Sequence, residues 1–363
     1  MKVVLWGMGT ALPRFAMGQE EAAKAAALIS GHSEEEAQRL VKLYRITGIS
    51  RRYSVLIDHN GGGPLHERQS FFPRAAESAQ GPGIGQRMDR YEREAPPLAV
   101  EAAGRALAQA ETSPTDITHV ITVSCSGFVA PGLDVELIRR LGLPSTTQRT
   151  HIGFMGCHGA LNGLRAAKAF VESENACVLL VALELCTLHY HYRWDMQKNV
   201  ANALFADGAA AAVLGPAVPG RDAGWRAVAT GSCLVPNSLD AMTWRIRDHG
   251  FEMTLSQEVP QLIETHLELW LRGWLAQQGR TLRDIRSWAV HPGGPTILRA
   301  TAQALGLKKA DLEVSWDALR EFGNMSSPTL LFILNELRRQ QAPLPCVALG
   351  FGPGLAAEAV LFD

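Results

Sequence analysis

Apolar and polar residues alternate along the first part of this chain with two different periods. The apolar run Val3–Trp6 predicts a strand that enters a turn at Gly7 and Gly9. The turn does not complete a dinucleotide-binding fingerprint, because a third glycine and a suitably placed acidic residue are missing. Apolar residues at helical spacing follow in Glu20–Leu28 and Glu34–Tyr44, which predicts two helices.

The next segment of the chain shows neither the strand pattern nor the helix pattern of apolar residues. His59–Arg90 is rich in glycine, proline and charge, and this composition predicts a loop region with short helices at most. Pro96 follows, and proline is favoured at the first position of a helix because it has no N–H to leave unsatisfied. We therefore predict a helix that begins at Pro96 and extends to Ala110.

A weak internal repeat relates one segment in the first half of the chain to another in the second half. Each unit contains a helix, an Asp-Ile pair and a strand that ends in a tight turn. The first unit comprises Ala99–Ala110, Asp116-Ile117 and Val120–Val123. The second comprises Ile263–Gln278, Asp284-Ile285 and Ser287–Val290. Such a repeat predicts a duplicated α/β fold built from two similar halves.

Length and composition limit the class of protein. The chain has 363 residues, of which 47% are hydrophobic, and its formal net charge is −1, which argues against a nucleic-acid surface. The longest apolar candidate for a membrane span, Ala201–Val218, is interrupted by polar, glycine and proline residues, and the N-terminus lacks the apolar core of a signal peptide. The six cysteines lack paired spacing. They indicate reduced thiols and a cytoplasmic protein.

Cys157 carries the most informative local pattern in the chain. It lies among small residues in Gly153–Leu164, directly before a helix-forming run. Free N–H groups and the helix dipole favour a thiolate at a helix N-terminus, and glycines leave room for a substrate to approach the sulfur. A buried structural cysteine is the alternative interpretation of this segment taken alone.

Two later segments supply partners for such a thiol. His291 precedes a Pro-Gly-Gly turn, and Asn324 lies in Gly323–Pro328. Each segment alone is typical of an ordinary turn. Together with Cys157 they provide a nucleophile, a base and an amide donor, which are the groups needed to form and use a thioester.

With these segments the chain resembles the type III polyketide synthases, the chalcone synthase-like branch of the thiolase superfamily. Five segments occur in the family's order: Gly156–Leu164, Leu204–Ala210, His291–Gly294, Gly323–Ser327 and Gly350–Leu355. The resemblance implies the thiolase fold, in which two duplicated halves form five αβαβα layers. Residues 1–220 would form the half with the nucleophile. Residues 221–363 would form the half with His291 and Asn324.

The resemblance also implies roles for these residues. Cys157 would hold the acyl starter as a thioester, and His291 would stabilise its thiolate. His291 and Asn324 would donate to the enolate oxygen formed when malonyl-CoA loses CO₂, and the resulting carbanion would attack the acyl group in a Claisen condensation. The substrates would be an acyl-CoA starter and malonyl-CoA, with no separate cofactor and no metal. A homodimer is expected from the family.

Other positions match the family less closely. Phe205 matches an aromatic gate at the chamber entrance, although simple core packing would also explain it. A second aromatic gate is replaced by Met253, whose flexible side chain can still line an entrance. The expected pocket residues Cys125, Ala130 and Cys186 are small, which suggests a medium- or long-chain acyl starter and an alkylpyrone or alkylresorcinol product.

CoA carries phosphates, so a basic surface is expected near the entrance. Arg39, Lys42 and Arg45 lie near one face of a predicted helix, and the first two match the family's CoA-binding positions. A third basic position of the family is Ile46 here, and Arg45 would replace it. A solvated helix face is the alternative interpretation.

Two other functions remain open at this point. A ketoacyl synthase III-like enzyme uses the same three residue types but prefers a malonyl group on an acyl carrier protein and extends once. A non-catalytic thiolase-fold subunit that binds acyl chains is the third interpretation, although such proteins typically lose the nucleophile.

Overall fold

Nine strands of the computed structural model, which describes residues 2–220 and 224–363, form one hydrogen-bonded sheet. Their order is β11-β12-β13-β8-β1-β7-β6-β4-β5. The strands of the N-terminal half are β1 (Val3–Ala11), β4 (His119–Ser124), β5 (Gln148–Gly153), β6 (Val178–Leu185) and β7 (Asp207–Pro216). Those of the C-terminal half are β8 (Trp225–Leu234), β11 (Ser287–Val290), β12 (Cys346–Gly352) and β13 (Ala356–Phe362). The two halves are joined where β1 pairs with β8.

Helices cover both faces of each half of the sheet. They are α1 (Gln19–Ser30), α2 (Glu34–Ile46), α3 (Ile84–Gln109), α4 (Leu133–Leu141), α5 (Gly159–Glu174), α6 (Met196–Leu204), α7 (Val259–Gln277), α8 (Pro295–Leu305), α9 (Glu313–Phe322) and α10 (Ser327–Arg339). Single 3₁₀ turns are η1 (Leu65–Glu67), η2 (Pro114–Asp116), η3 (Gly156–His158), η4 (Cys186–His189), η5 (Leu282–Asp284), η6 (Lys309–Leu312) and η7 (Pro353–Leu355).

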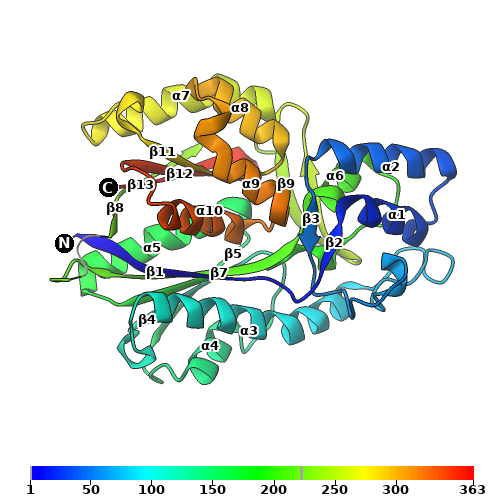
Figure 1. Cartoon of the computed structure of the whole chain (residues 1–363), viewed down its shortest axis with the longest axis horizontal. Coiled ribbons are helices and arrows are strands. Elements are labelled where there is room, and N and C mark those ends of the chain that lie inside the picture. The colour runs from blue at the N-terminus through cyan, green and yellow to red at the C-terminus, as the bar shows by residue number, and fades with distance from the viewer. Residues whose placement is uncertain (1, 221–223) are drawn as a thin grey trace.

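Figure 1 shows five layers stacked from α3 and α4 to α7 and α8, with α5 and α10 sandwiched between the two halves of the sheet. One hydrophobic core lies between α3 and the first half, and a second surrounds α5 and α10. A third core lies between α7, α8 and the second half. The predicted αβαβα thiolase fold is therefore confirmed.

The internal repeat corresponds to real structural units. In both halves a long helix leads through a 3₁₀ turn into a buried strand, α3 to η2 to β4 and α7 to η5 to β11. Both strands pair in parallel with a neighbour, β4 with β6 and β11 with β12. Parallel strands buried on both faces are typical of such layered α/β folds.

Two local predictions were wrong. Helix α3 begins at Ile84, inside the segment predicted to be a loop, and passes through Pro96 and Pro97. The prolines suggested a start because they cannot donate a helical hydrogen bond, but the buried side chains of Tyr91 and Ala95 hold the preceding turns in place.

The second error concerns Gly7 and Gly9, which lie inside β1 rather than in a turn. A Cβ on Gly9 would lie 2.3 Å from the carbonyl oxygen of Ala102 in α3. These glycines therefore allow a helix and a strand to pack in close contact.

Two small two-stranded sheets and three helices lie toward one end of the layers in Figure 1. One sheet pairs β2 (Ala16–Gly18) with β3 (Arg51–Tyr53), which α1 and α2 separate in the chain, and the other is a hairpin of β9 (Met242–Arg247) and β10 (Gly250–Leu255). Together with α1, α2 and α6 they supply many of the residues that line the cavities described below. Within residues 2–220 and 224–363, the apolar stretches of the helices are too short to cross a membrane.

Candidate active site

Cys157 lies in η3, the single 3₁₀ turn that directly precedes α5. This is the helix-terminal position that the sequence predicts. Gly156 has a φ of +70°, and a Cβ at this position would lie 2.4 Å from Cδ of Pro353. Glycine is therefore required for the chain to turn beneath the 350–355 loop and place Cys157 behind it.

Burial controls the electrostatics of this thiol. The side chain is only 6% exposed, and desolvation raises its pKa to about 11. Hydrogen bonds from the side chains of Ser326 and Asn324 lower the pKa, while the Glu184 carboxyl raises it. The thiol is therefore protonated at neutral pH, and Ser326 and Asn324 offset part of the effect of burial.

His291 follows β11, and its backbone N–H donates to the Leu349 carbonyl at 2.8 Å. The residue is 1% exposed, and among the residues described neither ring nitrogen has a hydrogen-bond partner. Burial, together with a smaller effect of the neighbouring His158, lowers its pKa to about 3. A buried neutral imidazole with two available nitrogens is unusual in a protein interior and points to a role with a ligand.

Asn324 is held by backbone and side-chain hydrogen bonds in the segment between α9 and α10. Its N–H donates to Leu204 O, and its carbonyl accepts from Ala206 N–H, each at 2.9 Å. The side-chain oxygen Oδ1 accepts from the Ser326 N–H at 2.7 Å. This bond assigns the amide orientation, so Nδ2 remains as a donor.

The three residues meet at one small cavity of about 20 Å³, lined by Cys157, His291 and Asn324. A second cavity of about 20 Å³ shares Cys157 and is lined by Cys125, Glu184 and Cys186. Segments far apart in the chain thus converge on one thiol, as the sequence predicts. The arrangement places a thiol, an imidazole and an amide around one cavity, which are the groups that thioester chemistry requires.

Glu184 organises the wall behind Cys157. Its carboxylate accepts from Cys125 N–H at 2.9 and 3.0 Å, from the Ser126 hydroxyl at 2.6 Å and from the Ser327 hydroxyl at 3.2 Å. Burial raises its pKa to about 7 despite these donors. Cys125 and Cys186 are buried, and desolvation raises the pKa of both thiols, so they remain neutral.

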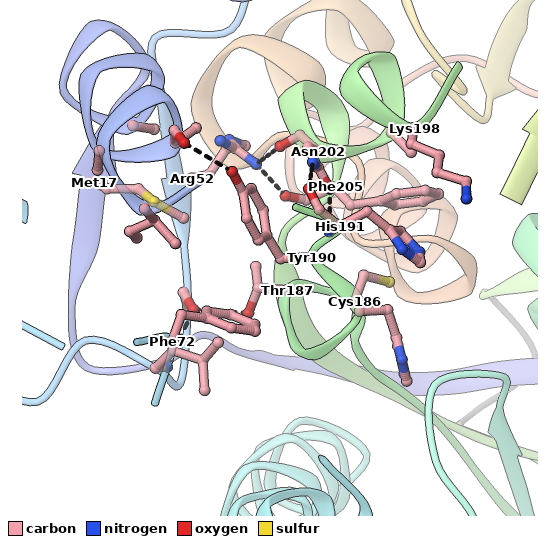
Figure 2. Close-up of a pocket in the computed structure, with 18 of the residues that line it drawn as sticks. Met17, Arg52, Phe72, Cys186, Thr187, Tyr190, His191, Lys198, Asn202 and Phe205 are labelled. Atoms are coloured by element: carbon pink, nitrogen blue, oxygen red, sulfur yellow. Dashed lines mark hydrogen bonds between the residues drawn. The ribbon is translucent and has the colours of Figure 1, made fainter. Parts of the chain in front are cut away.

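A third, larger and mainly apolar cavity of about 100 Å³ adjoins these two. Figure 2 shows Met17 and Phe72 on one side of it and Phe205 and Lys198 on the other. Phe205 and Met253 line all three cavities. Their position at this junction is the one expected for the two gate residues.

The remaining predicted site residues lie outside these cavities. Ala130, predicted to be a pocket residue, is exposed and lines none of the described cavities. Arg39, Lys42 and Arg45 are exposed on α2. Arg39 pairs with Glu35, whereas Lys42 and Arg45 line a shallow surface groove between α1 and α2.

Two residues near the thiol were not predicted. Ser326 lines the cavity behind the thiol and lowers the pKa of Cys157, and Trp244 lines both this cavity and the large one. Met242, Trp244 and Ile246 alternate with polar residues, but Ile246 is exposed, so this alternation does not determine that Trp244 faces inward. No motif marks either position, because both depend on how distant segments pack.

The two histidines of the run His189–Tyr192 are engaged in contacts within the protein. His189 donates from Nε2 to Ser126 O at 2.7 Å, accepts from Phe251 N–H at 3.0 Å and stacks on the Phe251 ring. Within the described part of the chain, no group of three His, Cys, Asp or Glu residues is placed to hold a metal.

The family models and the individual relatives that match this chain agree with one another. The family model for chalcone and stilbene synthases matches in both parts, the N-terminal domain over residues 1–218 and the C-terminal domain over residues 227–363. The chain is 32% identical to the alpha-pyrone synthesis polyketide synthase-like Pks18 of Mycobacterium tuberculosis, over 99% of this chain and 91% of that protein. It is 37% identical to 1,3,6,8-tetrahydroxynaphthalene synthase of Streptomyces peucetius, over 73% of this chain and 72% of that protein.

Solved structures extend the similarity to three dimensions. PKS-I from the brown alga Ectocarpus siliculosus matches with a TM-score of 0.94 and 31% identity, over 100% of this chain and 98% of that chain. The fungal type III polyketide synthase ORAS matches with a TM-score of 0.85 and 26% identity, over the full length of both chains.

Proposed function

Because this chain belongs to the chalcone and stilbene synthase family and is a type III polyketide synthase, we propose that its starter is a medium- or long-chain acyl-CoA. Type III polyketide synthases are acyltransferases that use acyl-CoA and malonyl-CoA, so the predicted enzyme class is confirmed. A starter with an alkyl chain is supported by the mainly apolar cavity that adjoins the two small cavities at Cys157. The product proposed is a pyrone or resorcinol, and the pyrone-related name of a 32% identical relative supports the first.

The first step proposed is loading of the starter on Cys157. The sulfur attacks the acyl-CoA carbonyl, the thiol proton passes to neutral His291, and the CoA thiolate leaves and takes up that proton. One thioester replaces another, so the exchange is nearly thermoneutral. The available ring nitrogens of His291 and the raised pKa of Cys157 support a proton transfer that accompanies attack.

The second step is decarboxylation of malonyl-CoA. The bond to the carboxylate breaks, CO₂ leaves, and the electron pair forms an enolate whose charge lies on the thioester oxygen. Asn324 Nδ2–H and a His291 N–H are the proposed donors to that oxygen. Removal of one such donor in other enzymes costs about 3 kcal/mol of transition-state stabilisation.

Condensation then moves the chain from the enzyme to CoA. The carbanion attacks the acyl carbonyl on Cys157, the new carbon–carbon bond forms, and the thiolate of Cys157 leaves. The extended chain can reload on Cys157 for another round or close into a ring. Ring closure would take place in the space beside Glu184, Cys125 and Cys186.

The large cavity is the proposed site of the acyl tail. Its wall on α1 contains the small residues Ala22, Ala25 and Ala26 together with Ile29, and Leu65 and Phe72 also line it. A volume of about 100 Å³ corresponds to roughly eight water-sized spheres. This size suits a medium chain, and a longer tail would require the walls to move apart.

The proposal also includes the CoA-binding surface, the cellular location, the oligomeric state and the division of the chain into two halves. Lys42 and Arg45, together with Arg39, would bind the phosphates of CoA near the surface. The protein would act in the cytoplasm as a homodimer in which Ala130 meets the partner subunit. Residues 1–220 and 221–363 would form its two halves, although the boundary itself falls at residues 221–223, outside the described residues.

The test is a product assay by liquid chromatography and mass spectrometry. Purified protein receives malonyl-CoA with short, aromatic, medium- and long-chain acyl-CoAs, beside Cys157→Ala and the control Cys233→Ala, a half-buried cysteine outside the site cavities. Cyclised products that disappear only in Cys157→Ala, and that form best from medium or long chains, are expected. Best turnover of short or aromatic starters would contradict the proposed starter. Condensation only with malonyl on a carrier protein would contradict the use of CoA esters.

A further inference from the structure

The hairpin of β9 and β10 carries an aromatic residue directly opposite the position where the second gate was expected. Met253 in β10 pairs across the strands with Trp244 in β9. In an antiparallel pair, side chains of directly opposed residues lie on the same face of the hairpin. The indole of Trp244 therefore faces the same space as Met253, and both residues line the large cavity and the cavity behind the thiol.

Trp244 is fixed in this position by several contacts. Its Nε1–H donates to the Cys125 carbonyl at 2.8 Å, which anchors the indole to the wall behind Cys157. Its ring lies 6.2 Å from the Phe205 ring, 5.7 Å from His189 and 5.8 Å from Phe251, measured between centroids. Aromatic pairs at these distances attract one another beyond their buried area.

Its location separates two compartments. The cavity of about 20 Å³ behind the thiol and the cavity of about 100 Å³ along α1 share Trp244, Cys186, Phe205 and Met253 in their walls. Cys186 is small and Met253 is flexible, so the indole and the Phe205 ring are the bulky, rigid parts of this boundary. A starter tail that runs from Cys157 through the cavity behind the thiol passes between them to reach the larger cavity.

We propose that Trp244 supplies the second aromatic side of the gate and determines which starter tails can pass from Cys157 into the α1 cavity. This inference rests on the proposed function, because it takes the α1 cavity as the tail's destination. An unbranched alkyl chain can pass beside a fixed indole, whereas a tail that carries a ring is obstructed. Trp244 is thus a specificity-determining residue for the starter.

The experiment measures loading of Cys157 without malonyl-CoA, so that extension and cyclisation do not enter. Wild type, Trp244→Ala and Trp244→Phe are incubated with octanoyl-CoA or with a phenyl-terminated medium-chain acyl-CoA, and the acyl-enzyme is followed by intact-protein mass spectrometry. Trp270→Ala is the matched control, because Trp270 is also half-buried but packs in the core between α7 and the second half of the sheet.

Trp244→Ala is expected to raise the rate ratio of the phenyl-terminated to the octanoyl starter by about tenfold, the scale on which apolar pockets discriminate size. Trp244→Phe keeps a ring but loses the bond to Cys125 O, so an intermediate increase is expected. Trp270→Ala should keep the wild-type ratio. A wild-type ratio in Trp244→Ala, or in Trp244→Phe if the alanine variant does not fold, would overturn the inference. Wild-type protein that loads octanoyl-CoA no better than acetyl-CoA would instead contradict the proposed starter.

Discussion

The backbones of Phe205 and Asn324 form an isolated parallel β-bridge between the two halves of the molecule. Through this bridge the residue at the cavity junction and the proposed amide donor are fixed relative to each other. The Asn324 side chain gains a further constraint from the Ser326 N–H, which leaves only Nδ2 available to a ligand. A donor with so little freedom needs no reorganisation when charge develops beside it.

Asn324→Ala should therefore slow decarboxylation of malonyl-CoA by about 10²–10³-fold, because one fixed donor to the enolate oxygen is lost. The measurement is release of CO₂ and acetyl-CoA. Alkylation of Cys157 by iodoacetamide checks that the pocket remains intact, and Asn60→Ala provides a surface control. Decarboxylation within about threefold of wild type would mean that Asn324 does not act on the enolate.

The raised pKa of Cys157, about 11, leads to a specific pH profile in the free enzyme. The thiolate fraction, and with it the rate of alkylation by iodoacetamide, should rise roughly tenfold per pH unit from neutral pH to about pH 10. Cys157→Ala identifies the reacting thiol by mass spectrometry. A rate that is already at its plateau near neutral pH would instead show a thiolate stabilised by protonated His291 before substrate binds.

Glu184 should make the protein's stability depend on pH near neutrality. Its pKa is raised to about 7 in the folded state, so the native state holds a proton that the unfolded state releases. The associated stability is present below the ordinary carboxyl pKa and is lost as the pH rises through about 7. Glu184 alone therefore contributes less to the free energy of unfolding at pH 8 than at pH 5, whereas buried histidines such as His291 contribute in the opposite direction, so the Glu184 contribution is isolated by comparing wild type with a variant in urea unfolding.

Glu184→Gln removes this titration while it keeps the size of the side chain. At pH 5 the variant should be less stable by about 1–3 kcal/mol, because its amide nitrogen faces N–H and hydroxyl donors. Its deficit should shrink toward pH 8, since only wild type then buries a charge. Other titrating groups, such as Asp207, are common to both proteins. An equal difference in unfolding free energy at both pH values is the result that would reject this assignment.

Lys42 and Arg45 should affect substrate affinity rather than chemistry. Both are exposed cations on α2, and their attraction to CoA phosphates is weakened by solvent. Replacing both by alanine should raise the KM for malonyl-CoA about threefold to tenfold at low salt with little change in kcat, and the difference should shrink at high salt. Arg139→Ala in α4 is the control. A drop in kcat with unchanged KM would place these residues in the chemistry instead.

Local patterns were sufficient for much of the fold and for the central site. The strand–helix repeat, the helix after Cys157 and the turns after His291 and before Asn324 are each encoded within a few residues. The five layers followed from the family resemblance. The errors occurred where tertiary packing overrides local preference, as in the passage of α3 through Pro96 and the close contact of Gly9 with Ala102.

The walls of the cavities could not be predicted in the same way. Trp244 faces the thiol because of the register of β9 and β10, and Ala25 faces the large cavity because of the rotation of α1. Residue type and spacing alone do not predict which way either side chain faces. The protonation states of Cys157 and His291 also depend on burial, which a sequence pattern does not measure.

The orientation of α1 gives a direct test of where the starter tail lies. Ala25 is buried and lines the large cavity, whereas Ala27, two residues later, lines the surface groove on the outer side of the helix. Ala25→Leu should reduce kcat/KM for the longest accepted acyl-CoA by about 10–100-fold, because the added carbons occupy the space of the tail. Turnover of acetyl-CoA should stay near wild type, and the control Ala108→Leu, at an exposed position of α3 that lines none of the described cavities, should leave both substrates unaffected. If Ala25→Leu lowers acetyl-CoA and long-chain turnover equally, the added side chain disturbs folding or the thiol itself. If it changes neither, the tail lies elsewhere and the α1 cavity is not the starter site.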